Sequence, residues 1–337
     1  MSESRIVAEA AGAGALERLL VVTQADMERV NAMILTRAHS HVELVPELAR
    51  YLIEAGGKRL RPMLTIAAAQ LFGRQTGAEI NYAAAVEFMH NATLLHDDVV
   101  DDSDMRRGRP AARMIWGNPA SVLVGDFLLG QAFLMMVEAG DLDALGTLAR
   151  AATVIAEGEV FQLAKARDLE TTANEYQQVI RAKTATLFEA AAEVGALAGG
   201  ADAAGRQALR DYGLELGLAF QLVDDVLDYR GETGTLGKNT GDDLREGKMT
   251  LPVILALADA NPAEREIIAA TLGKPDATDT MVAQIVAIFD RHGTLDRTIE
   301  RARDHVARAR AALGTLPPSV MRTLLSDIAE FYVSRVH

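Results

Sequence analysis

Two short acidic segments are the residues best placed to do chemistry, because they repeat one pattern. Residues 94–101 read LLHDDVVD and residues 221–228 read QLVDDVLD, and we call them the first and second acidic cassettes. On a helix, the first and last aspartate of each cassette lie one turn apart on one face. The six carboxylates are Asp97, Asp98 and Asp101 in the first cassette and Asp224, Asp225 and Asp228 in the second.

The apolar residues that flank these aspartates argue against a merely solvated acidic surface. Neighbouring carboxylates repel one another and resist removal from water. A multivalent cation among them relieves both costs, and carboxylate oxygens suit Mg²⁺, which usually shares its coordination with substrate phosphate. Two matching cassettes on facing helices therefore predict a site for several Mg²⁺ ions and a polyphosphate ligand.

Two basic segments supply the opposite charge. The segment GGKRLRP, residues 56–62, places three cations between a Gly-Gly break and a proline that favours a helix start. Such a turn can hold a phosphate, although an isolated basic turn is usually only solvated. The segment RRGRP, residues 106–110, follows the first cassette. Its arginines either form surface ion pairs, which contribute little, or bind phosphate oxygens bidentately.

Single lysines and histidines near these motifs are ambiguous when each is taken alone. Lys183 lies in a mostly apolar helical stretch and would extend to solvent, and Lys238 is an ordinary loop lysine. His96 directly precedes the first aspartate pair and is interpreted as a hydrogen-bonded neighbour rather than a metal ligand. His90 lies two helical turns before Asp97 on the same face, where it either donates to a phosphate or is a satisfied core histidine.

Composition limits the possible partners and compartments. The net charge of −13 argues against nucleic acid as the main partner. The absence of cysteine excludes disulfides and thiolate metal sites and fits a reducing cytoplasm. The N-terminus lacks the features of a signal peptide. The longest apolar runs, 114–125 and 127–137, are broken by Asp126, so we expect no transmembrane helix.

Residue patterns predict an all-α protein. No proline lies between residues 120 and 251, and this span is rich in strong helix formers. Residues 147–166 and 176–197 place apolar residues at helical spacing. Both cassettes must serve one site, so we predict a single domain over residues 1–337 with a central cavity and a loosely attached segment at 1–25. Residues 231–247 are polar and glycine-rich, which predicts a loop able to close over the second cassette.

With these motifs assembled, the chain resembles the trans-prenyl diphosphate synthases, the polyprenyl synthetase family, from about residue 45 onward. The likeness rests on motifs in matching order and spacing: GGKRLRP, MHNATLLHDDVVD followed by MRRGRP, KTATLFEAA, and FQLVDDVLDY followed by a lysine-bearing loop and GKMTLP. The resemblance implies one bundle of long helices around a deep cavity, usually in a homodimer.

The resemblance also implies roles for individual residues. The diphosphate of isopentenyl diphosphate would be bound by Lys58, Arg61, His90 and Arg107. The allylic diphosphate would be bound by Arg106, Lys183, Thr184, Gln221 and Lys238. Three Mg²⁺ ions would be held by Asp97, Asp101 and Asp224, supported by Asp98, Asp225 and Asp228. Lys248, in GKMTLP, is a further candidate phosphate contact.

The implied reaction is a sequential head-to-tail condensation of isopentenyl diphosphate onto an allylic diphosphate, expected to be farnesyl diphosphate. Ala92 and Thr93, one turn before Asp97, are small where early-stopping family members carry aromatic rings. We therefore expect a long product, octaprenyl or decaprenyl diphosphate for the ubiquinone side chain, with decaprenyl favoured. The sequence does not identify the residue that forms the cavity floor. Because the expected product is strongly hydrophobic, we expect the enzyme to contact the membrane transiently during product release.

Three other interpretations fit parts of the sequence. A di-iron carboxylate bundle needs two Glu-x-x-His pairs, and only Glu87 with His90 matches. A non-catalytic subunit of a heteromeric synthase would have lost aspartates or phosphate-binding cations, all of which are kept here. A terpene cyclase would share an aspartate-rich cassette but would not need the cations at Lys58, Arg61 and Arg107.

Overall fold

The computed structural model describes residues 14–73, 76–230 and 240–334, and these residues are almost entirely helical. The prediction of an all-α fold is confirmed. The longest helices are α2 (Ala15–Arg37), α5 (Ala78–Val100), α6 (Ala112–Ala139), α7 (Leu142–Lys165), α10 (Ala203–Arg230) and α15 (Thr294–Gly314). The shorter helices are α3 (Leu44–Glu54), α4 (Leu60–Phe72), α8 (Ala173–Ile180), α9 (Thr186–Ala198), α11 (Asp242–Glu246), α12 (Leu251–Asp259), α13 (Pro262–Thr271), α14 (Asp279–His292) and α16 (Val320–Ser334).

Two smaller elements complete the chain near the site. A π-helix, η1 (Arg181–Ala185), joins α8 to α9. A two-residue antiparallel hairpin, β1 (Met105–Arg106) with β2 (Arg109–Pro110), joins α5 to α6. The hairpin and the π-helix both interrupt regular α-helix beside the motifs. They therefore change the direction of the side chains that follow each interruption.

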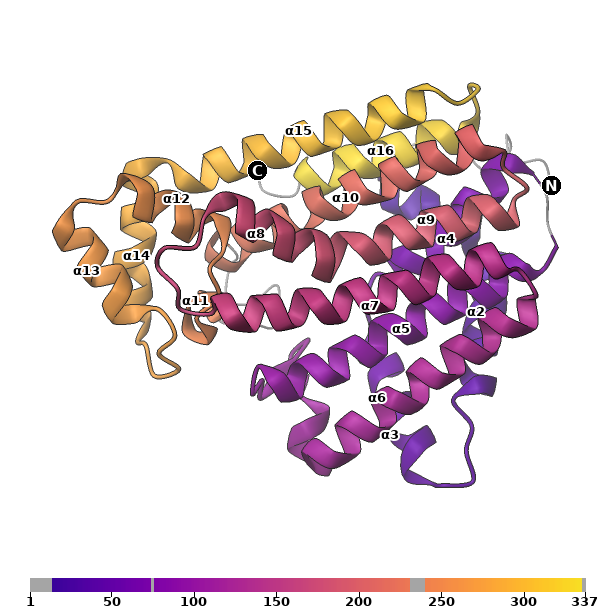
Figure 1. Cartoon of the computed structure of the whole chain (residues 1–337), viewed down its shortest axis with the longest axis horizontal. Coiled ribbons are helices and arrows are strands. Elements are labelled where there is room, and N and C mark those ends of the chain that lie inside the picture. Colours follow the sequence, from indigo (N-terminus) through magenta and orange to yellow (C-terminus); the bar gives the residue numbers. More distant parts are fainter. Residues whose placement is uncertain (1–13, 74–75, 231–239, 335–337) are drawn as a thin grey trace.

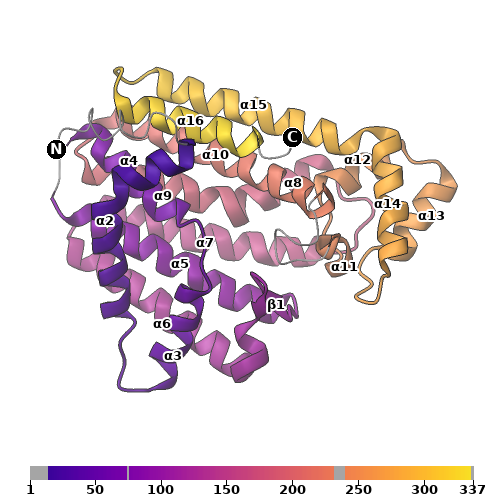
Figure 2. The same ribbon diagram turned by 180° about the vertical axis from the view of Figure 1, so that it is seen from behind.

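Helices α7, α9, α10 and α15 lie side by side along the molecule (Figure 1). The helices α10, α15 and α16 lie along one side, while α5 and α6 lie along the other, with α7 and α9 between them. The shorter helices α11 to α14 gather at one end, opposite the end at which α2 lies, and the reverse view agrees (Figure 2). The two cassettes, at the ends of α5 and α10, therefore belong to different sides of one bundle.

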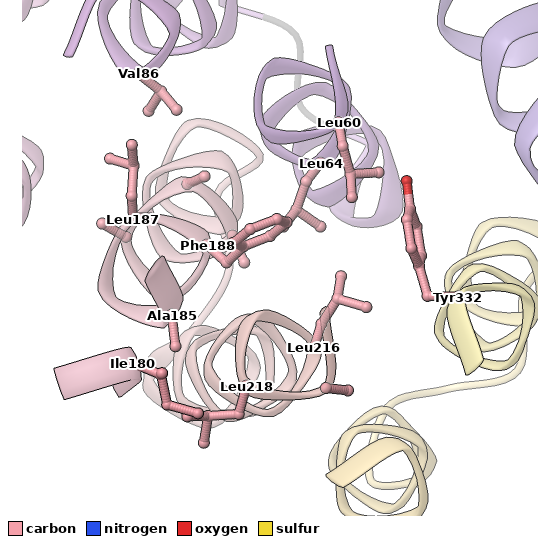
Figure 3. Close-up of a cluster of buried hydrophobic side chains, with 14 of the residues drawn as sticks. Leu60, Leu64, Val86, Ile180, Ala185, Leu187, Phe188, Leu216, Leu218 and Tyr332 are labelled. Atoms are coloured by element: carbon pink, nitrogen blue, oxygen red, sulfur yellow. The ribbon is translucent and has the colours of Figure 1, made fainter. Parts of the chain in front are cut away.

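The core is built from close helix crossings. A Cβ atom at Gly213 of α10 would lie 2.5 Å from the carbonyl oxygen of Phe188 in α9, so only glycine permits this approach. Around the crossing, Leu64, Phe188 and Leu216 point toward one another from three helices (Figure 3). Fixing α9 against α10 also fixes η1, which precedes α9, against the second cassette.

Helix α6 combines apolar composition with partial exposure. It is kinked where Gly117 has φ 81° and ψ 163° and Pro119 follows. It continues through Asp126, so the two apolar runs that the sequence separates form one helix of 28 residues. By length and composition alone, α6 could cross a membrane, and no other helix of the described ranges could. It packs mainly against α5.

The N-terminal segment differs in part from the expectation that residues 1–25 are loosely attached. Helix α2 begins at Ala15, and both Leu19 and Thr23 are fully buried against the bundle. Their spacing of four residues places them on one helix face, which packs against α4 and α5. Residues 1–13 lie outside the described part of the chain.

Candidate active site

Both acidic cassettes lie at the C-terminal ends of their helices. Helix α5 ends at Val100, and the backbone N–H of Asp101 donates to the carbonyl of Asp97 at 2.8 Å. Asp224 and Asp228 lie in the last two turns of α10, which ends at Arg230. The C-terminal end of a helix already carries partial negative charge, so carboxylates there are doubly disfavoured. These helix ends therefore need cations.

Asp98 shows the clearest local mismatch between charge and partner. Its side chain is fully buried, and its Oδ1 accepts hydrogen bonds from Arg106 Nε at 2.8 Å and Nη2 at 2.5 Å. Its second oxygen, Oδ2, is also buried but has no hydrogen-bond partner among the described residues. Burial raises the pKa of Asp98. A buried carboxylate oxygen without a donor beside Asp97 and Asp101 is compatible with a nearby cation.

The π-helix η1 brings a lysine to the first cassette. Lys183 Nζ lies 3.5 Å from Asp97 Oδ2 and donates to Glu159 Oε2 at 2.7 Å. Burial alone lowers the pKa of Lys183, but the carboxylates of Asp97 and Glu159 outweigh it and raise the pKa above its ordinary value. The ammonium group is therefore charged and held between two carboxylates. The close approach depends on Gly158, where a Cβ would lie 2.5 Å from Ala182 Cβ.

A chain of hydrogen bonds links η1 to the second cassette. Thr184 Oγ1 donates to Gln221 Oε1 at 2.8 Å, and Gln221 Nε2 donates to Asp225 Oδ1 at 2.8 Å. The other oxygen of Asp225 accepts from the hydroxyl of Tyr176 at 2.5 Å. Burial, with Asp243 nearby, raises the pKa of Asp225 well above its usual range. Asp225 therefore acts as a fixed support, whereas Asp224 beside it is exposed.

Lys248 joins the first cassette to the segment after the second. Its Nζ lies 3.4 Å from Asp101 Oδ2 and 3.5 Å from Asp243 Oδ1, and it pairs closely with Glu246. Asp243 in turn donates its backbone N–H to Asp228 Oδ2 at 3.3 Å. Burial disfavours the ammonium form, but the three carboxylates outweigh burial and raise the pKa of Lys248 well above its ordinary value.

A separate cluster of cations forms at the start of α4. Arg61 Nη1 lies 3.4 Å from His90 Nε2, and the guanidinium of Arg61 stacks 4.3 Å above the ring of Phe188. Burial lowers the pKa of Arg61 to about 10. Burial, followed by the charge of Arg61 and then Arg107, lowers the pKa of His90 well below its ordinary value. Because burial and neighbouring arginines disfavour the charged forms of these side chains, an anionic ligand would stabilise them.

Lys58 and Arg107 complete the cationic cluster. Lys58 is exposed, with Nζ 5.5 Å from the centroid of the Tyr332 ring. Arg107 lies in the hairpin turn and donates to the carbonyl oxygen of Gly56. Burial lowers the pKa of Arg107, and Arg106 lowers it further. The hairpin thus sends Arg106 to the first cassette and Arg107 to the cationic cluster.

The donor set fits Mg²⁺ in chemistry, although the side chains alone do not form a closed site. Asp97, Asp101 and Asp224 offer hard carboxylate oxygens, and Asp98 Oδ2 lies buried without a donor beside them. Within the described ranges, no three acidic or histidine side chains converge as a ready-made metal site. Magnesium usually completes its coordination with water and substrate phosphate, so an incomplete protein shell is what this chemistry requires.

The structure brings most of the predicted residues into these two groups. The cationic cluster holds Lys58, Arg61, His90 and Arg107. The acidic group holds Arg106, Lys183, Thr184 and Gln221 with the cassette aspartates. Lys238 lies outside the described residues, so its predicted role stays a prediction.

The sequence did not predict two residues of the site: Glu159, which pairs with Lys183, and Tyr176, which donates to Asp225. One sequence signal for Glu159 was available: it follows Gly158 within a long helical stretch, where glycine often marks a close approach. The hydroxyl of Tyr176, in contrast, is placed by tertiary contact alone.

An all-α bundle with two aspartate-rich helix ends, lysines between them and an adjacent arginine cluster belongs to the isoprenoid synthase class of enzymes. Comparison with known proteins gives the particular family. The sequence profile described as Polyprenyl synthetase matches residues 42–289. The chain belongs to the polyprenyl synthetase family and is a prenyltransferase of the long-chain trans-prenyl diphosphate synthase type.

Similar proteins span nearly the whole chain. Octaprenyl diphosphate synthase from Escherichia coli is 43% identical over 320 residues, covering 95% of this chain and 99% of its own. A polyprenyl synthase from Caulobacter crescentus, solved with calcium and isoprenyl diphosphate, has a TM-score of 0.92 at 51% identity, covering 96% and 99%. A decaprenyl diphosphate synthase from Rhodobacter capsulatus has a TM-score of 0.90 at 49% identity, with the same coverage.

Proposed function

We propose that the protein is a Mg²⁺-dependent synthase that condenses isopentenyl diphosphate onto farnesyl diphosphate in repeated head-to-tail steps. The observation that carries this proposal is the division of charge into two neighbouring environments. One is an arginine-rich cluster around Arg61, in which Glu87 is a buried counter-charge. The other is a pair of acidic helix ends, where Lys183 reaches Asp97 and Lys248 reaches Asp101. A two-substrate diphosphate enzyme needs one place that binds a diphosphate without metal and another that binds it with metal.

The cationic cluster is the proposed site for isopentenyl diphosphate. Burial, followed by neighbouring arginines, lowers the pKa of Arg61, His90 and Arg107, and a diphosphate among them would favour their charged forms. Lys58 lies at the exposed edge, where it can meet the diphosphate as it enters. The bidentate geometry of arginine fixes the diphosphate and therefore the direction of the attached double bond.

The acidic group is the proposed site for the allylic diphosphate and three Mg²⁺ ions. Asp97, Asp101 and Asp224 would hold the ions, while Asp98, Asp225 and Asp228 would support them from the same helix ends. When bound, Mg²⁺ neutralises the negative charge that grows on the departing diphosphate. Lys183, with Thr184 and Gln221 behind it, directs a fixed positive charge at the same phosphate group. Arg106 and Lys238 are proposed to join this set.

The reaction then follows from charge placement. The C1–O bond of the allylic diphosphate breaks, and both electrons leave with the diphosphate. The π electrons of isopentenyl diphosphate form the new C–C bond, and the released diphosphate accepts the proton lost from C2. The cation must be kept from water, and we propose that the segment 231–247 serves this purpose. Residues 231–239 lie outside the described part of the chain, and the rest of the predicted loop contains the short helix α11, which Lys248 follows.

The product is proposed to be decaprenyl diphosphate, with octaprenyl diphosphate as the second candidate, for the ubiquinone side chain. Small residues at Ala92 and Thr93 leave α5 without an aromatic floor one turn before Asp97. The decaprenyl synthase neighbour shares 49% identity and the octaprenyl synthase relative 43%. We propose a cytoplasmic enzyme that meets the membrane transiently when this product leaves.

We also propose that the enzyme works as a homodimer through α6. The outward face of this helix exposes large apolar side chains, among them Leu123 at 67%, Leu134 at 52% and Val137 at 60%. Exposed apolar residues gathered on one long helix are typical of a subunit interface. An interface of this kind would cover the apolar surface that makes α6 resemble a membrane span.

The deciding experiment is incubation of the full chain with Mg²⁺, farnesyl diphosphate and labelled isopentenyl diphosphate, followed by chromatography of the products. We expect a long linear prenyl diphosphate to form, and chelation of the metal to abolish it. Release of a cyclic hydrocarbon would favour a terpene cyclase instead. A protein that stays inert at every Mg²⁺ concentration would contradict the proposal.

A further inference from the structure

A cavity that is open to solvent lies outside the site described above. It is lined by α8 with the first residue of η1, by α10 and by α15, and its volume is about 400 Å³. This volume falls within the range of small-molecule sites. None of the residues proposed to touch either prenyl substrate lines it. The cavity is therefore a separate place on the molecule whose chemistry can be examined on its own.

The charged groups of the cavity favour an anion. On one wall, Glu215 Oε2 accepts from Arg308 Nε at 2.9 Å and lies 2.6 Å from His305 Nδ1, so one carboxylate serves both residues. On the opposite wall, the exposed side chain of Arg181 makes no hydrogen bond among the described residues, and its nearby countercharge is Glu189. Arg181 and Arg308 thus outnumber Glu215 in the cavity of a protein with net charge −13.

Neutral hydrogen-bonding groups surround these charges. Asn174, Gln177 and Gln178 are exposed on α8 and line the same cavity. Each amide offers both donors and an acceptor, which match hydroxyl groups on a ligand. Two guanidinium groups on opposite walls can share the oxygens of one dianionic phosphate, whereas a single carboxylate satisfies only one of them. The chemistry fits a small organic phosphate that carries hydroxyl groups.

The cavity lies behind the elements that position the proposed allylic site. Helix α8 lines it and also carries Tyr176, which bonds Asp225. Helix α10 lines it with Leu218, less than one turn before Gln221. Ile180, the last residue of α8, points toward Leu218 in the core behind the cavity (Figure 3). The same elements thus face the cavity on one side and the hydrogen-bonded network on the other.

The π-helix connects the two sides most directly. Arg181 opens η1, and its carbonyl oxygen accepts from Thr186 Oγ1 at 2.9 Å, a bond that spans the wide turn. Lys183 and Thr184 occupy the middle of that turn. A π-turn is rare and often marks a functional position, because its hydrogen bonding is readily rearranged. A ligand that draws Arg181 toward Arg308 would move the turn that aims Lys183 and Thr184.

We propose that this solvent-open cavity binds a small organic phosphate and that its occupancy changes the affinity of the enzyme for its allylic substrate. The first half rests only on the cavity. The second half rests on the proposed roles of Lys183 and Thr184 in the allylic site.

Direct binding tests the first half without reference to catalysis. Calorimetry on the full chain in metal-free buffer uses glycerol 3-phosphate and adenosine 5′-monophosphate as probes. We expect Arg181→Gln and Arg308→Gln each to weaken binding of at least one probe by about tenfold or more. The matched control, Lys183→Gln, removes a cation from the active site and should leave the affinity within about twofold of wild type. Both arginines are exposed, so melting temperatures should stay close to wild type.

Two results would overturn the cavity proposal. One is the absence of binding by either probe at millimolar concentration, and the other is binding that Lys183→Gln weakens while the arginine variants do not. The second half is tested by the KM for farnesyl diphosphate, which the bound probe should change by roughly threefold or more in wild type but not in Arg181→Gln. An unchanged KM in wild type refutes the coupling. A protein inactive toward prenyl donors would refute the proposed function and the coupling, while the calorimetry would still decide the cavity.

Discussion

Lys248 Nζ lies 3.4 Å from Asp101 Oδ2, so a lysine that follows the second acidic cassette reaches the first. The same ammonium group pairs with Asp243 and Glu246, and Asp243 bonds Asp228 through its backbone. Lys183 makes the corresponding contact to Asp97. Two lysines therefore supply positive charge to the first acidic helix end, and one of them also connects it to the segment after the second.

Replacing Lys248 by Met should destabilise the metal-free protein. The substitution keeps the length of the side chain but leaves three partly buried carboxylates without their cation, which costs about 3 kcal/mol when a buried pair is broken. Denaturant unfolding in the presence of a chelator measures this loss. Added Mg²⁺ should restore part of it, because an ion that binds only the folded state stabilises that state.

The control for this change is Lys165→Met. Lys165 also pairs with two carboxylates, Asp168 and Glu175, but these belong to neither cassette and are more exposed than Asp101 and Asp243. We expect little change in stability and no recovery on addition of Mg²⁺. Equal behaviour of the two variants would show that Lys248 does not serve as a buried counter-ion.

Replacing Asp97 by Ala should cut turnover by roughly a hundredfold or more while the helical fold survives. Asp97 is only partly buried and lies at a helix end, so its removal leaves no cavity in the core. Product formation and circular dichroism measure the two effects. Ala in place of the exposed Asp126 on α6 is the control. Wild-type turnover in Asp97→Ala would remove the basis for placing metal at the first cassette.

The sequence predicts the helical fold and the six aspartates as candidate site residues for one reason. Both predictions depend on the spacing of residues close together in the sequence. Apolar periodicity over long proline-free stretches determines helices, and the repeated DDxxD pattern identifies both cassettes. Lys183 shows the limit of prediction from local sequence spacing. As a single lysine in an apolar helix it is expected to extend into solvent, but η1 turns it toward Asp97 and Glu159. That direction depends on a π-turn and on a helix crossing that no short window reveals.

The pairing of charges is likewise a tertiary property. Arg106 and Arg107 are adjacent in sequence, but the hairpin sends one to Asp98 and the other to Gly56. Glu159 reaches the site only because Gly158 lets η1 approach α7. Local spacing therefore predicts which residue types assemble, while helix packing decides which carboxylate meets which cation.

Glu159 should make stability depend on pH. Burial, together with the charge of Asp97, raises the pKa of Glu159 from 4.5 to about 7. A raised folded-state pKa gives stability that is present below pH 4.5 and is lost as pH rises to about 7. Relative to Glu159→Gln, the free energy of unfolding of the wild type should therefore fall by roughly 2 kcal/mol between pH 5 and pH 8, after allowance for solvent screening. Unfolding in chelator at both pH values measures this difference.

The control is Glu157→Gln, two residues earlier on the exposed side of α7. The difference in the free energy of unfolding between Glu157→Gln and wild type should be the same at the two pH values. A constant difference between wild type and Glu159→Gln over the same interval would mean that Glu159 is already ionised at pH 5.

Bulk at positions 92 and 93 should shorten the product. Thr93 is half-buried on α5 and donates to the carbonyl of His90 at 2.8 Å, whereas Ala92 is almost fully buried in the core. We expect Ala92→Phe with Thr93→Phe to stop elongation early, by blocking the path along α5. Because a ring at Ala92 also overpacks the core by about 1–3 kcal/mol, the single variant Thr93→Phe separates the two effects.

Chromatography of the prenyl products measures chain length in each variant. Thr93→Val, which changes the hydroxyl but not the volume, is the control and should give the wild-type length. A wild-type product from a folded Thr93→Phe enzyme would show that the chain does not pass this face of α5.

A charge on the outward face of α6 should separate the proposed dimer. Leu123 is 67% exposed, and Leu123→Glu places a carboxylate where two apolar helices would meet. Because an unpaired charge cannot be buried without a large desolvation cost, we expect monomers by light scattering with an unchanged helical spectrum. Leu20→Glu, on the exposed side of α2, is the matched control and should leave the assembly intact. If both variants keep the wild-type mass, α6 does not form the interface, and its exposed apolar face needs another partner.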